Sequence, residues 1–393
     1  MTTPAPAEKR NVLLLATAQA LFQTAGVLVM TLSGLVGLQL APEPGLATLP
    51  IALMMVASAL ATIPASLFMQ RHGRRAGFLV GTALGAGAGL LAAGAIALSH
   101  FWLFVAANML MGAYQGVAQF YRFAAADAAS AAFRSRAISW VVAGGVVAAV
   151  AGPTLARLTQ HVGSLPFLAS YLSLVLLGAL AAVVVSRLSL PSPQAEAAQG
   201  PARPLAAILR QPVFITAVLG SLTGAGVMIM VMTATPLAMH VHGHALDASA
   251  SVIQWHVLGM FLPAFFTGRL IARAGVLPVM GMGIVLLAMH VAIALSGTAF
   301  LHFLSGLVLL GVGWNFLFVG GSTLLTEAHT PAEKGKTQAA HDFLVLAVVS
   351  IASFSAGKLL AVWGWQSVNL TALPLLGLSL LVLLWFARLR RRA

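Results

Sequence analysis

Four polar side chains share one face of an otherwise apolar stretch. They are Asn108, Gln115, Gln119 and Arg122. Their spacing of seven, four and three residues places them along one side of a helix. Such a face cannot meet lipid, because an Arg side chain at the bilayer centre costs about 2.5–3.5 kcal/mol even on lenient insertion scales. The stripe predicts a solute pathway in which Arg122 attracts an anionic or carbonyl-bearing cargo. The alternative is a structural Arg bound to helix carbonyls or to an acid of a neighbouring helix.

Further polar and aromatic residues within apolar stretches are candidates for contact with the same solute. They are Gln19, Gln23, Gln254, His256, Trp314 and Asn315. For each amide, the alternative is an interhelical hydrogen bond, which polar side chains commonly form inside membranes.

Coupling to protons would need a group that titrates within the pathway. The eight acids lie at helix ends, in loops, in a linker or in the tail, and none falls at mid-membrane. His256 is one candidate, because histidine changes charge near neutral pH. Asp342, beside His341, is the other. For His256, the alternative is a hydrogen-bonded structural role.

The composition requires that these residues be held by membrane helices. Hydrophobic residues make up 60% of the 393 and charged residues 7%, whereas soluble domains hold roughly 25% charged residues. A spanning helix takes about 20 apolar residues. The chain is therefore predicted to be an all-α integral membrane protein. It has no cysteine, which excludes disulfides and thiolate metal sites.

Twelve spans are predicted in two pseudo-symmetric six-helix bundles, 1–190 and 213–393, joined by a cytoplasmic linker at 191–212 that begins with a Pro/Ala/Gln-rich run. The spans run near 11–40, 47–69, 76–98, 101–126, 137–160, 164–187, 213–240, 249–272, 277–298, 299–328, 337–360 and 364–387.

The basic residues predict the orientation of these spans. Eighteen of the 21 Lys and Arg residues fall in the termini and in alternate loops, which the positive-inside rule assigns to the cytoplasm. Both termini are therefore expected to be cytoplasmic. The same distribution accounts for the net charge of +13 without nucleic acid as a partner.

Scarce charged residues repeat along the chain and predict a duplication. Asp127 and Glu327 are 200 positions apart, as are Gln115 and Asn315. The short basic loop around Arg71 recurs around Arg273, 202 positions later. Internal repeats of this kind are typical of secondary transporters, which bind their cargo near the bilayer midplane.

The basic loop resembles the signature between helices 2 and 3 of the major facilitator superfamily, roughly G-x-L-a-D-R-x-G-R-R. Arg71, Gly73, Arg74 and Arg75 match it, while Gln70 replaces the Asp. Weaker matches are Gln115-Gly116, without the Arg of the helix 4 signature, and Gly152-Pro153 of the helix 5 antiporter signature. The resemblance implies an alternating-access carrier, often monomeric, whose cavity is lined by helices 1, 4, 7 and 10.

The repeated charges are candidates for a cytoplasmic gate. Asp127 is expected to pair with Arg71, Arg74 or Arg75, and Glu327 with Arg269 or Arg273. The family signature adds Gly73, Gly152 and Pro153. The alternative is that these charges serve only to orient the helices.

The most favoured function is secondary active transport of a small organic solute across the inner (plasma) membrane, with a lean toward efflux. The missing signature Arg favours the alternative, uptake or facilitated entry of a polar, anionic or vitamin-like nutrient. No nucleophile or metal constellation indicates an enzyme, and no P-loop indicates ATP-driven transport. His240, His242 and His244 form an incomplete metal-ligand set. No cofactor is predicted, and the expected partners are the solute, the lipid bilayer and, if transport is coupled, protons.

Overall fold

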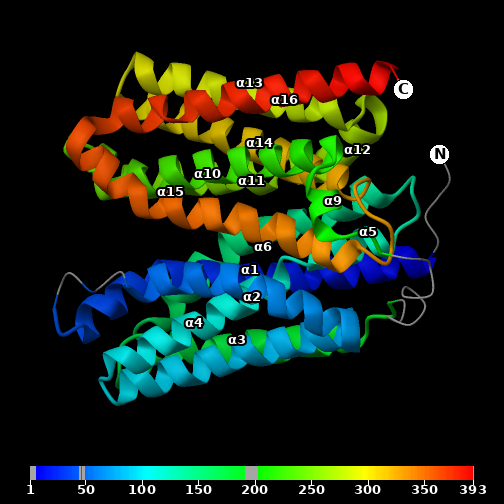
Figure 1. Ribbon diagram of the computed structural model, residues 1–393. Coiled ribbons are helices and arrows are strands. Elements are labelled where there is room, and N and C mark those ends of the chain that lie inside the picture. The colour runs from blue at the N-terminus through cyan, green and yellow to red at the C-terminus, as the bar shows by residue number, and fades with distance from the viewer. Residues whose placement is uncertain (1–5, 44–45, 47–48, 191–201, 393) are drawn as a thin grey trace. The chain divides into compact units, whose positions relative to one another are not determined.

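The computed structural model describes residues 6–43, 46, 49–190 and 202–392. In this part of the chain, twelve helices are long and apolar enough to cross a membrane, and every other regular element is also helical. The twelve spans and the all-α class are thereby confirmed (Figure 1). Residues 191–201 of the predicted linker lie outside the described residues.

The helices assemble into two compact units. Of the described residues, unit 1 holds those up to Ala131, from Gly144 to 190, and Pro331–Phe343. Unit 2 holds Ala132–Ala143 and most of the remainder after 202. Two helices therefore change unit along their length, α6 (Arg134–Thr159) and α15 (Lys334–Leu370).

The remaining helices of unit 1 are α1 (Pro6–Leu40), α2 (Leu49–His72), α3 (Arg74–Ala97), α4 (Phe101–Ala118), α5 (Tyr121–Asp127) and α7 (Leu168–Ser186). Within this unit α4 packs against both α2 and α3, as Figure 1 shows.

The remaining helices of unit 2 are α9 (Leu205–Leu209), α10 (Pro212–Val241), α11 (Leu246–Phe261), α12 (Ala264–Ala274), α13 (Val276–Ser296), α14 (Phe300–Leu325) and α16 (Ala372–Arg392). Figure 1 shows α13 and α16 side by side, and they are in contact. Gly364, at φ 78°, breaks the helix inside α15. The twelfth span, Val362–Arg391, begins beside this break and continues into α16.

Glycines set the tightest helix contacts of unit 1. A Cβ on Gly85 of α3 would lie 2.5 Å from a ring carbon of Tyr114 in α4, and one on Gly89 would lie 2.7 Å from the carbonyl O of Tyr171 in α7. Only glycine permits these approaches without a shift of the neighbour. The recurrence of glycine every fourth residue in this helix is therefore a packing feature.

Both basic loops turn on a glycine in the same conformation. Gly73, between α2 and α3, has φ 89°, and Gly275, between α12 and α13, has φ 89°. These residues are 202 positions apart, as the sequence repeat predicts. A positive φ of this size strains residues that carry a Cβ, so the loop requires glycine.

Helix packing fixes the repeat register of α4 and α14. A Cβ on Gly112 of α4 would collide with the carbonyl O of Met54 in α2. A Cβ on Gly311 of α14 would lie 2.6 Å from the carbonyl O of His256 in α11. The two glycines are 199 positions apart and their partners 202, so these contacts are equivalent in the two units.

A second pair of contacts, one turn further along, gives the same register. Gly116 brings α4 against Ser58 of α2, whose carbonyl O would lie 2.7 Å from an added Cβ. At the equivalent place, Asn315 Nδ2 donates to the carbonyl O of Met260 over 2.7 Å. In this packing, Asn315 is therefore equivalent to Gly116. The sequence repeat aligned Asn315 with Gln115, which is one position earlier.

The one-residue difference lies where the fourth span is interrupted. The helix stops after Ala118, and Gln119 and Phe120 form a turn before α5 begins at Tyr121. The tenth span, α14, is continuous from Phe300 to Leu325. From Gly116 to Asp127 is 11 positions, whereas from Asn315 to Glu327 is 12, so the second unit holds one more residue in this stretch and the offset rises from 199 to 200.

Candidate functional site

Arg122 is buried at the start of α5, with 4% of its surface exposed. Its Nη1 donates to the backbone O of Gln119 over 2.9 Å and to Oε1 of the same residue over 2.6 Å. Its Nη2 binds the carboxylate of Asp342, which is 220 positions away in the sequence. These are the contacts of the structural alternative, in which the Arg is bound to a helix carbonyl and to an acid.

Asp342 comes from the part of α15 that belongs to unit 1, and its side chain is 2% exposed. Oδ1 binds Arg122 and also lies 2.8 Å from Nδ1 of His341. Oδ2 is buried and has no hydrogen-bond partner among the described residues. Phe123 completes the cluster. Its ring centroid lies 4.4 Å from the guanidinium carbon of Arg122 and 6.2 Å from the ring centroid of His341.

A second polar cluster lies at the adjoining helix ends of unit 1. Asp127 binds Arg74 at 2.7 Å and Lys334 at 3.2 Å. Arg74 Nη2 also donates to Oε1 of Gln338 over 2.7 Å, and Ser66 donates to the carbonyl O of Gly335 over 2.7 Å. These bonds tie the beginning of α15 to α2, α3 and α5. Of the three arginines in the loop, Arg74 is therefore the partner of Asp127, while Arg71 and Arg75 are exposed.

The repeat-related acid makes a different pair. Glu327 binds Arg390 near the end of α16, and both side chains are well exposed. Arg273, on the expected loop, is exposed. The partner differs from the expected Arg269 or Arg273 because the end of the C-terminal helix α16 brings Arg390 to Glu327.

The start of α6 is held in unit 2 by serines that the sequence reasoning missed. Ser135 donates to the carbonyl O of Gly268 over 3.1 Å, and the Gly268 N–H donates to Oγ of Ser139 over 3.1 Å. Gly268 is 202 positions from Ser66, whose hydroxyl holds the start of α15. The two helices that change unit are thus anchored at repeat-equivalent places. The only signal in the sequence was the offset, because serine is otherwise unremarkable in a span.

The predicted amides divide into bonded and unbonded side chains. Gln19 and Gln23 of α1 and Gln115 of α4 are half-buried, and none makes a side-chain hydrogen bond to a described residue. Phe22 packs edge-on against Tyr114, with ring centroids 5.0 Å apart, which brings α1 and α4 together. Gln254 is exposed at the surface of α11.

His256 and Asn315 join helices inside unit 2. His256 is fully buried, and its Nδ1 lies 2.8 Å from the carbonyl O of Leu307. Its Nε2 has no partner among the described residues. Asn315 accepts from Thr267 over 2.7 Å and donates to Met260, so its amide is occupied.

Trp314 belongs to an aromatic group that the sequence reasoning identified only in part. Its ring is stacked on Phe318, with centroids 4.8 Å apart and planes at 14°. Phe261 meets it edge-on at 5.8 Å. The i,i+4 spacing on one helix could have indicated the stack, but phenylalanine is common in any span.

The antiporter-signature residues lie on α6. A Cβ on Gly152 would lie 2.7 Å from the Cβ of Val27 in α1, so glycine allows the two helices to touch. Pro153 is exposed within the same helix. Neither residue reaches the buried clusters described above.

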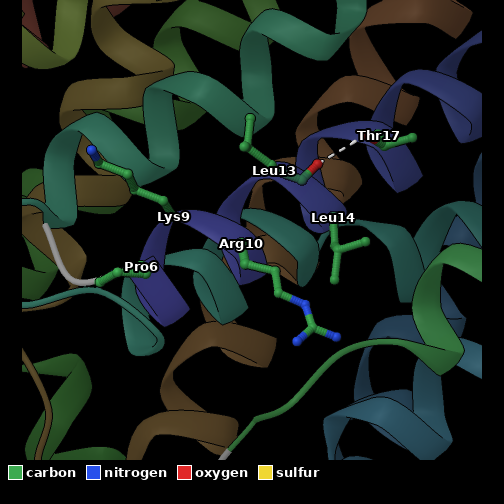
Figure 2. A pocket seen from close by; sticks show the side chains of 6 residues that line it. All are labelled: Pro6, Lys9, Arg10, Leu13, Leu14 and Thr17. Carbon is green, nitrogen blue, oxygen red and sulfur yellow. Dashed lines mark hydrogen bonds between the residues drawn. The ribbon is translucent and has the colours of Figure 1, made fainter.

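An open hollow of about 530 Å³ lies along the first turns of α1. Figure 2 shows that Lys9 and Arg10 point to different sides of the helix there. Both are exposed, as suits basic side chains that reach from a helix end toward a bilayer surface. None of the predicted site residues lines this hollow. Its lining is Pro6, Lys9, Arg10, Leu13, Leu14 and Thr17.

No group of three or more possible ligands that could hold a metal occurs among the described residues. In the histidine turn, His242 Nδ1 lies 2.7 Å from the carbonyl O of Ala238, and His244 Nε2 lies 2.8 Å from that of Thr298. The two imidazoles therefore have separate backbone partners.

Twelve apolar spans, buried ion pairs and repeated helix packing define a multi-pass membrane transporter. The chain belongs to the Major Facilitator Superfamily, whose model matches residues 13–256.

Two relatives extend over nearly the whole chain. The riboflavin transporter RfnT of Brucella anthropi is 43% identical over 385 residues, covering 97% of each protein. The uncharacterized MFS-type transporter YdeG of Bacillus subtilis is 30% identical and covers 96% of this chain and 92% of its own. The chain is accordingly a transporter of a small molecule rather than an enzyme.

Solved structures share the fold at low sequence identity. The human organic anion transporter MFSD10 (TETRAN) superposes with a TM-score of 0.78 at 16% identity, covering 96% of this chain and 100% of its own. The fucose:proton symporter FucP of E. coli gives 0.74 at 16% identity, covering 98% and 99%.

Proposed function

We propose that this protein carries riboflavin, or a closely related uncharged flavin, across the plasma membrane by alternating access, in the direction of uptake. The observation that carries the proposal is the 43% identity to a riboflavin transporter along 97% of both chains. Uptake of a vitamin-like nutrient is the function that the missing helix 4 Arg also favours.

The charge state of the buried residues supports an uncharged cargo. Arg122 is bound to Asp342, and the pair has no net charge when the carboxylate is ionised. An anionic cargo would have to displace that carboxylate. A neutral solute rich in carbonyl and hydroxyl groups would instead bind amides, and Gln19, Gln23 and Gln115 are half-buried with their amides unbonded.

The anchored starts of α6 and α15 are the proposed gate. Each is held by a few hydrogen bonds, from Ser135 and Ser139 for α6 and from Ser66 and Arg74 for α15. Single bonds of this kind contribute roughly 0.5–1.5 kcal/mol. A handful of them can therefore hold one state and still break during each transport cycle.

Proton coupling is assigned to Asp342 in this proposal. Its carboxylate faces Arg122 and His341, and Arg74, Asp127 and Lys334 form a second charged cluster in the same unit. Protonation of Asp342 would remove the charge that holds Arg122, and so would loosen the start of α15. His256, whose bonds are confined to unit 2, is the second candidate.

Transport in proteoliposomes tests the function directly. Purified protein would be reconstituted, and entry of riboflavin would be followed by flavin fluorescence with and without an imposed pH gradient. Saturable entry above empty liposomes is expected, with accumulation only when the outside is acidic. Absence of riboflavin transport under every gradient would refute the proposed cargo.

Direction and coupling need separate readouts. Growth of a riboflavin auxotroph on low riboflavin should depend on the protein if it works in uptake. Efflux, which Gly152-Pro153 favours, would instead lower cellular flavin. Asp342→Asn should keep riboflavin exchange between equal pools but lose gradient-driven accumulation, and His256→Gln is the matched comparison that should retain it.

A further inference from the structure

We infer that the aromatic pair Trp314–Phe318 of α14 is the subsite that receives the planar ring system of the cargo, with Trp314 Nε1 donating to a ring carbonyl or ring nitrogen. The inference rests on the proposed flavin cargo and deepens it. Within unit 2, these two residues would bind the ring of the cargo, whereas other buried residues only hold helices together.

The geometry of the two rings suits a planar ligand. Trp314 and Phe318 are one helical turn apart and nearly parallel, with planes at 14° and centroids 4.8 Å apart. Phe261 of α11 supports the indole edge-on. Trp314 is 6% exposed, whereas Phe318 is half-buried. Aromatic rings attract one another in offset-stacked and edge-to-face arrangements, so a flat heteroaromatic ring could add to this group in either way.

The indole N–H is the second and independent observation. Trp314 Nε1 is buried and has no hydrogen-bond partner among the described residues. A buried indole usually finds an acceptor, because the group can only donate and an unmet donor is costly. An uncharged flavin carries carbonyl oxygens and ring nitrogens in the plane of its rings, and these are acceptors. The cargo would thus supply the partner that the protein lacks.

The repeat shows where the two units differ. With the packing offset of 199, Trp314 is equivalent to Gln115 and Phe318 to Gln119. The glycine contacts beside them, at Gly112 and Gly311, are the same in both units. The backbone packing has therefore been kept, while two amides in the fourth span correspond to two aromatic rings in the tenth. Such a difference is expected where the residues serve the ligand rather than the fold.

The competing explanation is ordinary core packing of two aromatic residues. It makes different predictions for small changes. A packing role depends on ring volume and should alter thermal stability. A ligand role depends on the indole N–H and on the ring face, and should alter affinity for the flavin at unchanged stability.

The test is riboflavin binding to detergent-purified full-length protein, read from quenching of flavin fluorescence. Trp314→Phe keeps a ring and removes the N–H, and should weaken binding about threefold to tenfold. Phe318→Leu removes the stacking face and should weaken it by a similar factor, about threefold to tenfold. The matched control is Phe316→Leu, on the side of α14 that meets Gly283 of α13, which should leave affinity unchanged.

A second probe tests the assignment to the ring. Lumiflavin, which keeps the ring system and has a methyl group in place of the ribityl chain, should lose affinity by the same factor as riboflavin in each variant. If the wild type binds riboflavin and both variants bind it equally well, the ring subsite is wrong although the proposed function stands. If the wild type binds neither compound, the flavin cargo itself is refuted.

Discussion

Removal of one member of the Arg122–Asp342 pair should destabilise the protein far more than removal of both. The two side chains are 5% and 2% exposed, so neither is compensated by water when its partner is lost. Loss of one partner of a buried ion pair typically costs about 3–5 kcal/mol, whereas replacing the whole pair by apolar residues is often neutral. The variants are Arg122→Met, Asp342→Leu and the double substitution.

The size of the effect follows from the size of the unit. For a folded unit of about 150–250 residues, each kcal/mol shifts the unfolding midpoint by roughly 2–4 °C. Each single variant should therefore unfold roughly 6–20 °C below the wild type. The double variant should return to within about 3 °C of it, because no uncompensated charge remains in the interior.

Thermal unfolding in detergent, followed by intrinsic fluorescence, measures all four proteins under one condition. The exposed pair Glu327–Arg390 provides the control, and Glu327→Gln should cost less than about 1 kcal/mol. Single variants that unfold with the wild type would show that Arg122 is compensated elsewhere. A double variant whose loss of stability equals the sum of the two single losses would show that the two charges act independently, and the proposed release of Arg122 by protonation would lose its basis.

Three further predictions concern cargo charge and backbone geometry. Riboflavin phosphate, which carries about −1.5 to −2 charges, should not compete for riboflavin entry at tenfold excess, because the buried Arg122 is already bound by a carboxylate; effective competition would contradict this. Gly112→Ala should lower the unfolding midpoint by several degrees, since its Cβ would meet the Met54 carbonyl, whereas Gly87→Ala, with nothing within 4 Å, should be neutral or slightly stabilising. Gly275→Ala should cost on the order of 1 kcal/mol because φ is 89° there, and unchanged melting would refute the strain argument.

The spans could be predicted from the sequence because hydropathy and charge act locally. Lipid exposure requires about 20 apolar residues in a row, whatever the helix packs against. All twelve spans were therefore found, and the scarce charges between them were enough to indicate the family. The break at Gln119 and Phe120 was missed, because nothing in an apolar stretch marks a single turn between two helices.

Side-chain partners were predicted less well, because they depend on contacts distant in sequence. Periodicity places Arg122 on a face but cannot name an acid 220 positions away. The same limit applies to Glu327, whose partner is Arg390 and not the loop expected from the repeat. Asp127 was matched to the correct loop, where Arg74 at the start of α3 binds it.

Internal repeats separate the residues that build the fold from those that serve transport. Where both units need the same helix approach, the structure shows equivalent contacts, as at Gly112 and Gly311. Where the units carry different residues at equivalent positions, a packing requirement shared by both units cannot explain those residues. Arg122 of α5 has its counterpart in Ser322, 200 positions later, and the buried carboxylates among the described residues, Glu333 and Asp342, both belong to unit 1.

By the same reasoning, the proposed sites of proton coupling and of ring recognition fall in different units. The buried ion pair belongs to unit 1, and the stacked rings with the unpartnered indole N–H belong to unit 2. A carrier built this way should allow the two functions to be damaged separately. Asp342→Asn should abolish accumulation while leaving riboflavin affinity intact, and Phe318→Leu should weaken affinity while leaving the response to pH intact. A variant at either place that changed both properties together would show that ring binding and proton coupling share one site.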